Sequence, residues 1–207
     1  MFRPARYISD YLARQLALDS DTREVLRYGS EIILLSICGA VLLVLGGWLL
    51  GCLVPTLAAA FTLFLIRTFA GGAHCTSALR CNLAGVIIFP ALGKTAQVLH
   101  PLLNSLTLEF VLATGIPALI IVYRLSPVDS PAKPINTKAH RRRLKLMATF
   151  LAGAVLLFQL ISLVCHLLDH TTIIATGVGL MSSALVLTSP GHKALGLVDR
   201  ALRRVHL

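Results

Sequence analysis

A histidine and a cysteine lie seven residues apart in a short polar stretch, residues 67–81, that separates two apolar runs. They are His74 and Cys81. An imidazole takes up a thiol proton near neutral pH, and the resulting thiolate attacks carbonyl carbons. This combination of residue types indicates a cysteine nucleophile with a histidine as its general base.

The backbone between these two residues is predicted to be broken. Seven residues of continuous helix rise about 10.5 Å, whereas a thiol and its base must approach to roughly 3 to 4 Å. Gly71 and Gly72 precede His74 and supply flexible backbone. Thr76 or Ser77 is a suitable N-cap for a new helix.

In a helix that starts at this point, Cys81 lies in the first turns. Exposed amides and the positive end of the helix dipole favour a thiolate there, and Arg67 and Arg80 add to this effect. Backbone N–H groups of the helix start, or of the two glycines, are also placed to bind an oxyanion. The stretch is therefore a candidate active-site segment.

Other interpretations of the same residues stay open at this point. A packed histidine with an inert thiol is a common arrangement in an apolar protein, and Cys75 is a rival nucleophile. A metal site of His74, Cys75 and Cys81 lacks a fourth ligand nearby, so no metal is expected. No HExxH or GxSxG motif is present, which leaves metalloprotease and serine hydrolase mechanisms without support.

The composition identifies an all-α polytopic membrane protein. Hydrophobic residues make up 56% of the 207 residues, charged residues 14%, and the mean hydropathy is +0.80. The five cysteines form no CxxC pair, which disfavours a disulfide framework. We expect one transmembrane domain over residues 1–207 and no separate soluble domain.

Six transmembrane helices are predicted from six apolar runs. These lie at 32–53, 56–70, 82–100, 106–123, 146–167 and 171–189. Nearly all of the 19 Lys and Arg residues fall in alternate connections, and the positive-inside rule then places both termini in the cytoplasm. The net charge of +10 reflects this topology, so no nucleic-acid partner is expected. Residues 190–207 form a cytoplasmic tail.

Residues 1–31 form a cytoplasmic or interfacial N-terminal helix region. Ile8, Leu12 and Leu16 recur at helical spacing, which favours an amphipathic helix in contact with membrane lipid. A solvated helix fits the same pattern. Asp21 and Glu24 are spaced as a capping box, which predicts a second helix that runs on into the first apolar run.

The spacing of five residues resembles the motif of a known family. They are Arg67, Gly71, Gly72, His74 and Cys81, and the motif is that of the accessory gene regulator B (AgrB) proteins of Gram-positive quorum sensing. Tyr28-Gly29-Ser30-Glu31 and Pro127-Val128-Asp129 are similar to two flanking features of that family, as is Lys133-Pro134-Ile135. The resemblance covers nearly the whole chain. Asn82-Leu-Ala-Gly85 departs from it, because the family often has a serine there.

This resemblance implies a cysteine endopeptidase of the bacterial plasma membrane that needs no cofactor. Its substrate would be an AgrD-like precursor of an autoinducing peptide. Cys81 would attack the bond before the C-terminal tail, with His74 as base, and the thioester would then cyclise to a thiolactone or lactone. Further site residues are expected in three roles: Asp129 as third catalytic member; Arg67, Gly71, Gly72 and Arg80 as oxyanion or active-site support; and Lys133, Lys138, Arg141, Arg142 and Arg143 as contacts for an acidic tail.

A second function class is compatible with the same membrane topology. A small transporter or exporter of a signal peptide would use Lys94, Glu109 and His100 to line a path, and the His-Cys pair would be incidental. A transporter should tolerate Cys81→Ala, whereas a peptidase should not. The sequence does not distinguish a monomer from a homodimer.

Overall fold

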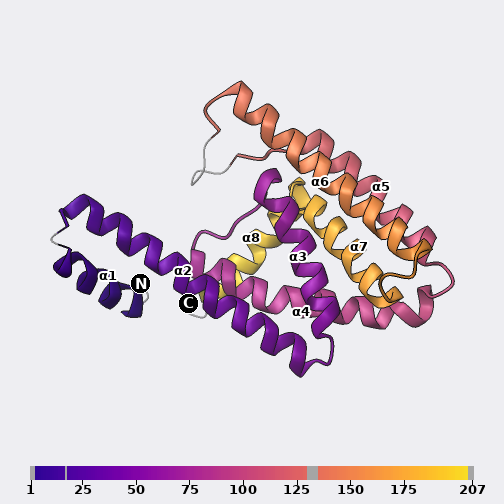
Figure 1. Ribbon diagram of the computed structural model, residues 1–207, viewed down its shortest axis with the longest axis horizontal. Helices are drawn as coiled ribbons and strands as arrows, with labels where there is room; N and C mark the ends of the chain where they lie inside the picture. The colour runs from indigo at the N-terminus through magenta and orange to yellow at the C-terminus, as the bar shows by residue number, and fades with distance from the viewer. Residues whose placement is uncertain (1–2, 17, 130–134, 205–207) are drawn as a thin grey trace.

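The computed structural model describes residues 3–16, 18–129 and 135–204. All regular structure in these residues is helical, which confirms the all-α prediction (Figure 1). The helices are α1 (Arg3–Gln15), α2 (Ser20–Leu49), α3 (Leu53–Ala70), α4 (Ala78–Leu103), α5 (Thr107–Leu125), α6 (Lys138–Val164), α7 (His170–Leu185) and α8 (Ser189–Arg204).

The N-terminal region is a pair of helices that extends away from the rest of the molecule (Figure 1). Asp19 caps α2, and its carboxylate accepts a hydrogen bond of 3.3 Å from the N–H of Thr22. The N-cap is therefore Asp19, two residues before the expected Asp21. The helix continues into the first apolar run as predicted. At about 1.5 Å per residue, the 30 residues of α2 exceed the thickness of a bilayer core. Its N-terminal part thus lies outside the hydrocarbon.

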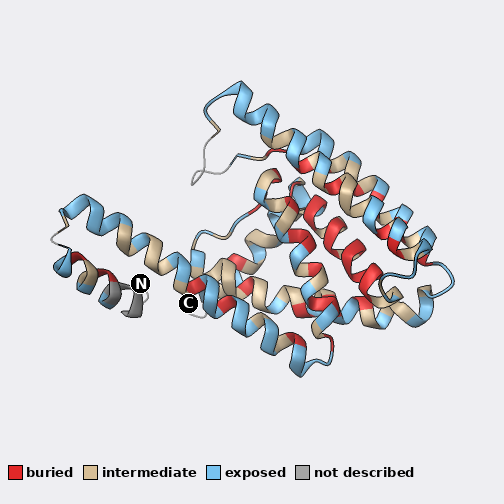
Figure 2. Cartoon of the chain, in the orientation of Figure 1, coloured by how far each residue is buried: buried red, intermediate tan, exposed pale blue. Residues whose placement is uncertain are grey.

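Helices α3 and α7 pack against each other at the centre of the molecule, and α4 contacts both of them. Small residues line both contacts: Gly93 of α4 lies against Thr56, and Gly179 of α7 lies against Ala59. Small side chains let helix backbones approach closely, and this is how membrane helices gain van der Waals contact. Figure 2 shows the buried residues concentrated on α7 and on the side of α3 that meets it.

Five helices, α2 to α6, are long and apolar enough to cross a membrane. The sixth candidate is α7 followed by α8, and these two helices are bent by 94° at their junction. The model thus agrees with six spans if the bent pair is counted as one. The segment expected as a C-terminal tail forms the amphipathic helix α8, which turns back across the end of the bundle.

We predict that Gly93→Ala destabilises the protein. A Cβ at this position would lie 2.6 Å from the backbone nitrogen of Thr56, so α3 and α4 would have to separate. Such overpacking costs about 1 to 3 kcal/mol, and a lower melting temperature in detergent measures it. Gly153→Ala in α6 is the control, since a Cβ there meets nothing within 4 Å. Equal melting temperatures for the two variants would contradict the close approach.

Candidate active site

The predicted break in the active-site segment is present. Helix α3 ends at Ala70, and the chain turns through Gly71 (φ 71°) and Gly72 (φ 119°). Helix α4 then begins after Ser77, whose extended backbone makes it the N-cap. Both glycines have φ values that side chains disfavour, so glycine is required at each.

The connector between α3 and α4 is held by backbone contacts on two sides. The N–H of Val128 donates to the carbonyl of Ala70 at 2.9 Å, and the N–H of Ala73 donates to the carbonyl of Val186 at 3.0 Å. A Cβ on Gly71 would lie 2.3 Å from the Val128 carbonyl oxygen. The sequence suggested that the glycines give flexibility, but here they allow close backbone approach and fix the connector in place.

Cys81 lies in the first turn of α4, as expected. Its N–H donates to the carbonyl of Ser77 at 3.0 Å, which is the first backbone bond of the helix. The amides of residues 78–80 precede that bond and have no acceptor within the helix. They are the donors best placed to bind an oxyanion beside the thiol.

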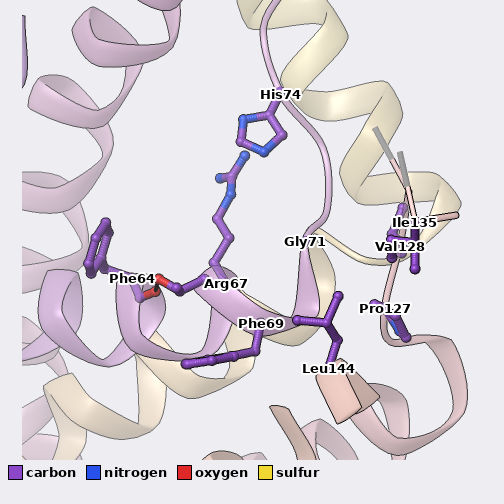
Figure 3. A pocket seen from close by; sticks show the side chains of 10 residues that line it. Phe64, Arg67, Phe69, Gly71, His74, Pro127, Val128, Ile135 and Leu144 are labelled. Atoms are coloured by element: carbon purple, nitrogen blue, oxygen red, sulfur yellow. Dashed lines mark hydrogen bonds between the residues drawn. The ribbon is translucent and has the colours of Figure 1, made fainter. Parts of the chain in front are cut away.

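The positive charge of Arg67 acts on both predicted catalytic residues, His74 and Cys81. Its guanidinium points toward the His74 ring and donates a hydrogen bond to the carbonyl of Ala73 (Figure 3). Its positive charge also acts on Cys81 and Cys75. The sequence placed Arg67 near the nucleophile, and in the structure it lies near the base as well.

His74 is exposed at the rim of this site. Partial burial of the ring, followed by the charge of Arg67, lowers the pKa of His74 below its ordinary value. The ring is therefore neutral at pH 7 and has a lone pair to accept a proton. No hydrogen bond joins His74 to the Cys81 thiol in the described part of the chain. Catalytic hydrogen bonds are often loose before the substrate binds.

Cys75 differs from Cys81 in its surroundings. Burial, followed by the neighbouring Cys81 and the carboxylate of Asp199, raises the pKa of Cys75 to about 11. The thiol of Cys75 is thus protonated at neutral pH. Its chemistry argues against the rival interpretation in which Cys75 is the nucleophile.

A mainly apolar cavity of about 390 Å³ opens beside His74 (Figure 3). It is formed where α3, the connector, the segment before α6 and α6 itself meet. The lining residues are Phe64, Arg67, Thr68, Phe69, Gly71, His74, Pro127, Val128, Ile135 and Leu144. The cavity suits an apolar side chain of a peptide, because Arg67 and His74 are the only charged or titratable groups among the described residues that line it.

Asp129, the expected third catalytic member, is bound by another residue. Its carboxylate pairs with the guanidinium of Arg141, and no hydrogen bond joins it to His74 among the described residues. Lys138, Arg142 and Arg143 are exposed on α6 and are available to an acidic partner. Lys133 lies outside the described residues.

The residues of the proposed transport path are Lys94, Glu109 and His100. Lys94 and Glu109 are both exposed, and the Lys94 ammonium donates to the carbonyl of Leu50 and to Gln97. Lys94 therefore binds a carbonyl near a helix end. His100 lies near His170, with ring centroids 6.3 Å apart. No three His, Cys, Asp or Glu side chains group as a metal site in the portion of the chain that the structure describes.

Asn82 follows Cys81 and joins α4 to α2. Its side-chain amide donates to the carbonyl of Leu35. A Cβ on Gly39 would lie 1.9 Å from the Asn82 side chain, so the two helices are in close contact there. Asn82 thus fixes the orientation of the helix turn that carries the cysteine.

Comparison with known proteins agrees with this geometry. The family model of accessory gene regulator B matches residues 5–187. This chain belongs to the AgrB family. A Clostridium perfringens strain SM101 protein named as AgrB-like is 24% identical over 204 residues, which cover 94% of each chain. A second from C. perfringens strain 13, named as AgrB-like protein 2, is 24% identical over 78% of this chain and 77% of its own. No solved structure matches.

The AgrB resemblance inferred from residues 67–81 is therefore confirmed. The matched region contains the broken connector, the cavity and both predicted catalytic residues. It ends before α8, although α8 also contacts the connector. The sequence did not point to this contact, because 123 residues separate Thr76 from Asp199.

We predict that the alkylation rate of Cys75 rises without a plateau as the pH is raised from 7 to 9. Its pKa is raised to about 11, so its thiolate fraction should grow about tenfold per pH unit over this range. Iodoacetamide labelling of the protein in lipid, followed by peptide mass spectrometry, measures the rate. The exposed Cys165 in the same molecules is the internal reference. A plateau below pH 9 would show that the Cys75 thiol is not suppressed.

Proposed function

We propose that this AgrB-family protein is a membrane cysteine endopeptidase. It removes the C-terminal tail of an AgrD-like precursor and cyclises the remaining peptide to a thiolactone or lactone. The observation that carries the proposal is the position of Cys81 in the first turn of α4, after a fixed connector that brings His74 beside Arg67. Family membership supports the same reaction and substrate.

The first step forms an acyl-enzyme. His74 accepts the proton of the Cys81 thiol, and the sulfur attacks the carbonyl carbon before the tail. The amides of residues 78–80 bind the oxyanion, and Arg67 stabilises the thiolate and the developing negative charge. The C–N bond then breaks, and protonated His74 gives its proton to the leaving amine. The products are a thioester on Cys81 and the free tail.

The second step releases the cyclic product. A cysteine thiol or serine hydroxyl within the peptide loses its proton to His74 and attacks the thioester carbonyl. The bond to Cys81 breaks, and the departing sulfur regains the proton. Exchange of a thioester for a thiolactone is nearly balanced in free energy, so removal of the tail and of the product must draw the reaction forward.

The cavity beside His74 supports a way of orienting the substrate. Aromatic and aliphatic side chains of Phe64, Phe69 and Leu144 line it next to the predicted base. An apolar residue of the precursor that enters this cavity would bring its backbone toward the connector. Substrate binding then closes the remaining gap between His74 and Cys81.

We predict that the wild-type protein in lipid forms a covalent adduct with a candidate precursor. Intact mass spectrometry should detect the signal segment on the wild type and on Cys75→Ala, but not on Cys81→Ala. His74→Ala should lower the rate of adduct formation by at least about 100-fold, the usual size of a general-base contribution. An adduct on Cys81→Ala would refute the assignment. Tail release by neither the wild type nor Cys75→Ala would instead favour the transporter.

We further predict that the exposed basic residues of α6 bind the acidic tail. The variant Arg142→Gln/Arg143→Gln should raise the apparent KM for the full-length precursor by roughly threefold to tenfold at low salt, with little change in kcat. These two residues are a better choice than Arg141, because Arg141 pairs with Asp129.

The control for this test is Arg203→Gln/Arg204→Gln in α8, which removes the same charge from another exposed site. A precursor whose tail carboxylates are replaced by amides (Asp→Asn and Glu→Gln) should show no difference between the variants. The same KM increase for both double variants would indicate a general charge effect. An unchanged KM for Arg142→Gln/Arg143→Gln would show that these residues do not bind the tail.

A further inference from the structure

Helix α8 folds back onto the segment that leads to Cys81. Asp199 is the one residue of α8 described as buried, and it is 8% exposed. Its carboxylate accepts a hydrogen bond of 2.8 Å from the Thr76 hydroxyl and one of 3.3 Å from the Thr76 N–H. It also forms an ion pair of 2.9 Å with Nε of Arg80. Asp199 thus holds residues on both sides of the N-cap of α4.

The start of α4 lacks the features that usually stabilise a helix N-terminus. Ser77 makes no side-chain capping bond, and the first turn contains no acidic residue. Arg80 instead places a positive charge near the positive end of the helix dipole, which is unfavourable. Asp199 provides from α8 a negative charge beside this terminus, and it accepts hydrogen bonds from Thr76, the residue before the N-cap.

The three side chains form a small closed network. Arg80 donates to the Thr76 hydroxyl at 2.6 Å, and both residues contact Asp199. The Arg80 and Asp199 side chains are only 14% and 11% exposed, so solvent screens the ion pair weakly. Cys81 follows Arg80 directly, and any movement of this turn moves the thiol. Asp199 is also close enough to Cys75 for its negative charge to disfavour the thiolate form of Cys75.

We infer that Asp199 is a positioning residue for the active site: from α8 it fixes the turn of Thr76 to Arg80 and thereby sets the position of Cys81. The inference rests on the proposed role of Cys81 as nucleophile. It goes beyond the family match, which ends at residue 187 and does not include α8. Asp199 itself does not touch the reacting atoms.

The test compares Asp199→Asn and Asp199→Glu in the full-length protein in lipid. Hydrogen exchange of residues 76–81 should be about tenfold faster in Asp199→Asn, as expected for the loss of a charge-assisted hydrogen bond. Iodoacetamide is the probe of the thiols, and the labelling of Cys75 relative to Cys81 should rise about threefold or more, because the repelling charge on Cys75 is removed. Asp199→Glu should restore both values toward the wild type.

The matched control is Asp169→Asn. Asp169 caps α7 and accepts hydrogen bonds from the N–H and hydroxyl of Thr172, the same bonds that Asp199 accepts from Thr76. If Asp169→Asn changed the exchange of residues 76–81 and the labelling ratio equally, the effect would be general loss of stability and the inference would fail. Unchanged values in Asp199→Asn would also overturn it.

A milder variant covers the case in which Asp199→Asn does not fold. Thr76→Val removes the hydroxyl but leaves the ion pair of Asp199 with Arg80, so it should increase exchange of the same residues by a smaller factor. No increase would overturn the inference. Neither probe needs a precursor, so these outcomes are independent of the peptidase test. With a precursor that is processed, Asp199→Asn should lower kcat for tail release and leave KM nearly unchanged.

Discussion

The backbone bridge between Gly71 and Val128 is the contact on which the active-site segment depends. It ends α3, because the chain must turn at a positive φ to pair with the loop before α6. The bond from Ala73 to the carbonyl of Val186 then holds the chain against the end of α7. These two contacts determine where α4 can begin. The cavity and the proposed base and nucleophile, His74 and Cys81, are all arranged around this fixed turn.

One guanidinium organises the electrostatics of the site. Arg67 lies on the last turn of α3, and its charge reaches His74, Cys75 and Cys81. A cation near a histidine keeps the ring neutral, and the same cation near a thiol favours the thiolate. In the proposed reaction, a neutral His74 can accept the proton of the Cys81 thiol, and the charge of Arg67 then stabilises the thiolate that forms. Asp199 balances the second cation, Arg80, so the site is not excessively positive.

Local features of this fold could be predicted from the sequence, and long-range contacts could not. Helical rise alone required a break before Cys81, and turn preferences located it at Gly71 and Gly72 and the N-cap at Thr76 or Ser77, of which Ser77 is the one found. The partners of Gly71 and Asp199 come from distant segments, and no spacing rule connects them. Asp129 could be identified from the sequence as the only carboxylate of the loop before α6, but its pairing with Arg141 depends on how α6 packs.

The arrangement of the two neighbouring cysteines affects where an acyl group can go. A thioester on Cys81 would lie beside a second thiol, and transfer between adjacent thiols is rapid when the acceptor is ionised. Burial and the carboxylate of Asp199 raise the pKa of Cys75 whether or not Cys81 carries an acyl group, so Cys75 is a poor acceptor. The acyl group would therefore stay on Cys81 until the peptide's own nucleophile arrives. In the proposed reaction, the environment of Cys75 would thus favour ring closure over a side reaction within the enzyme.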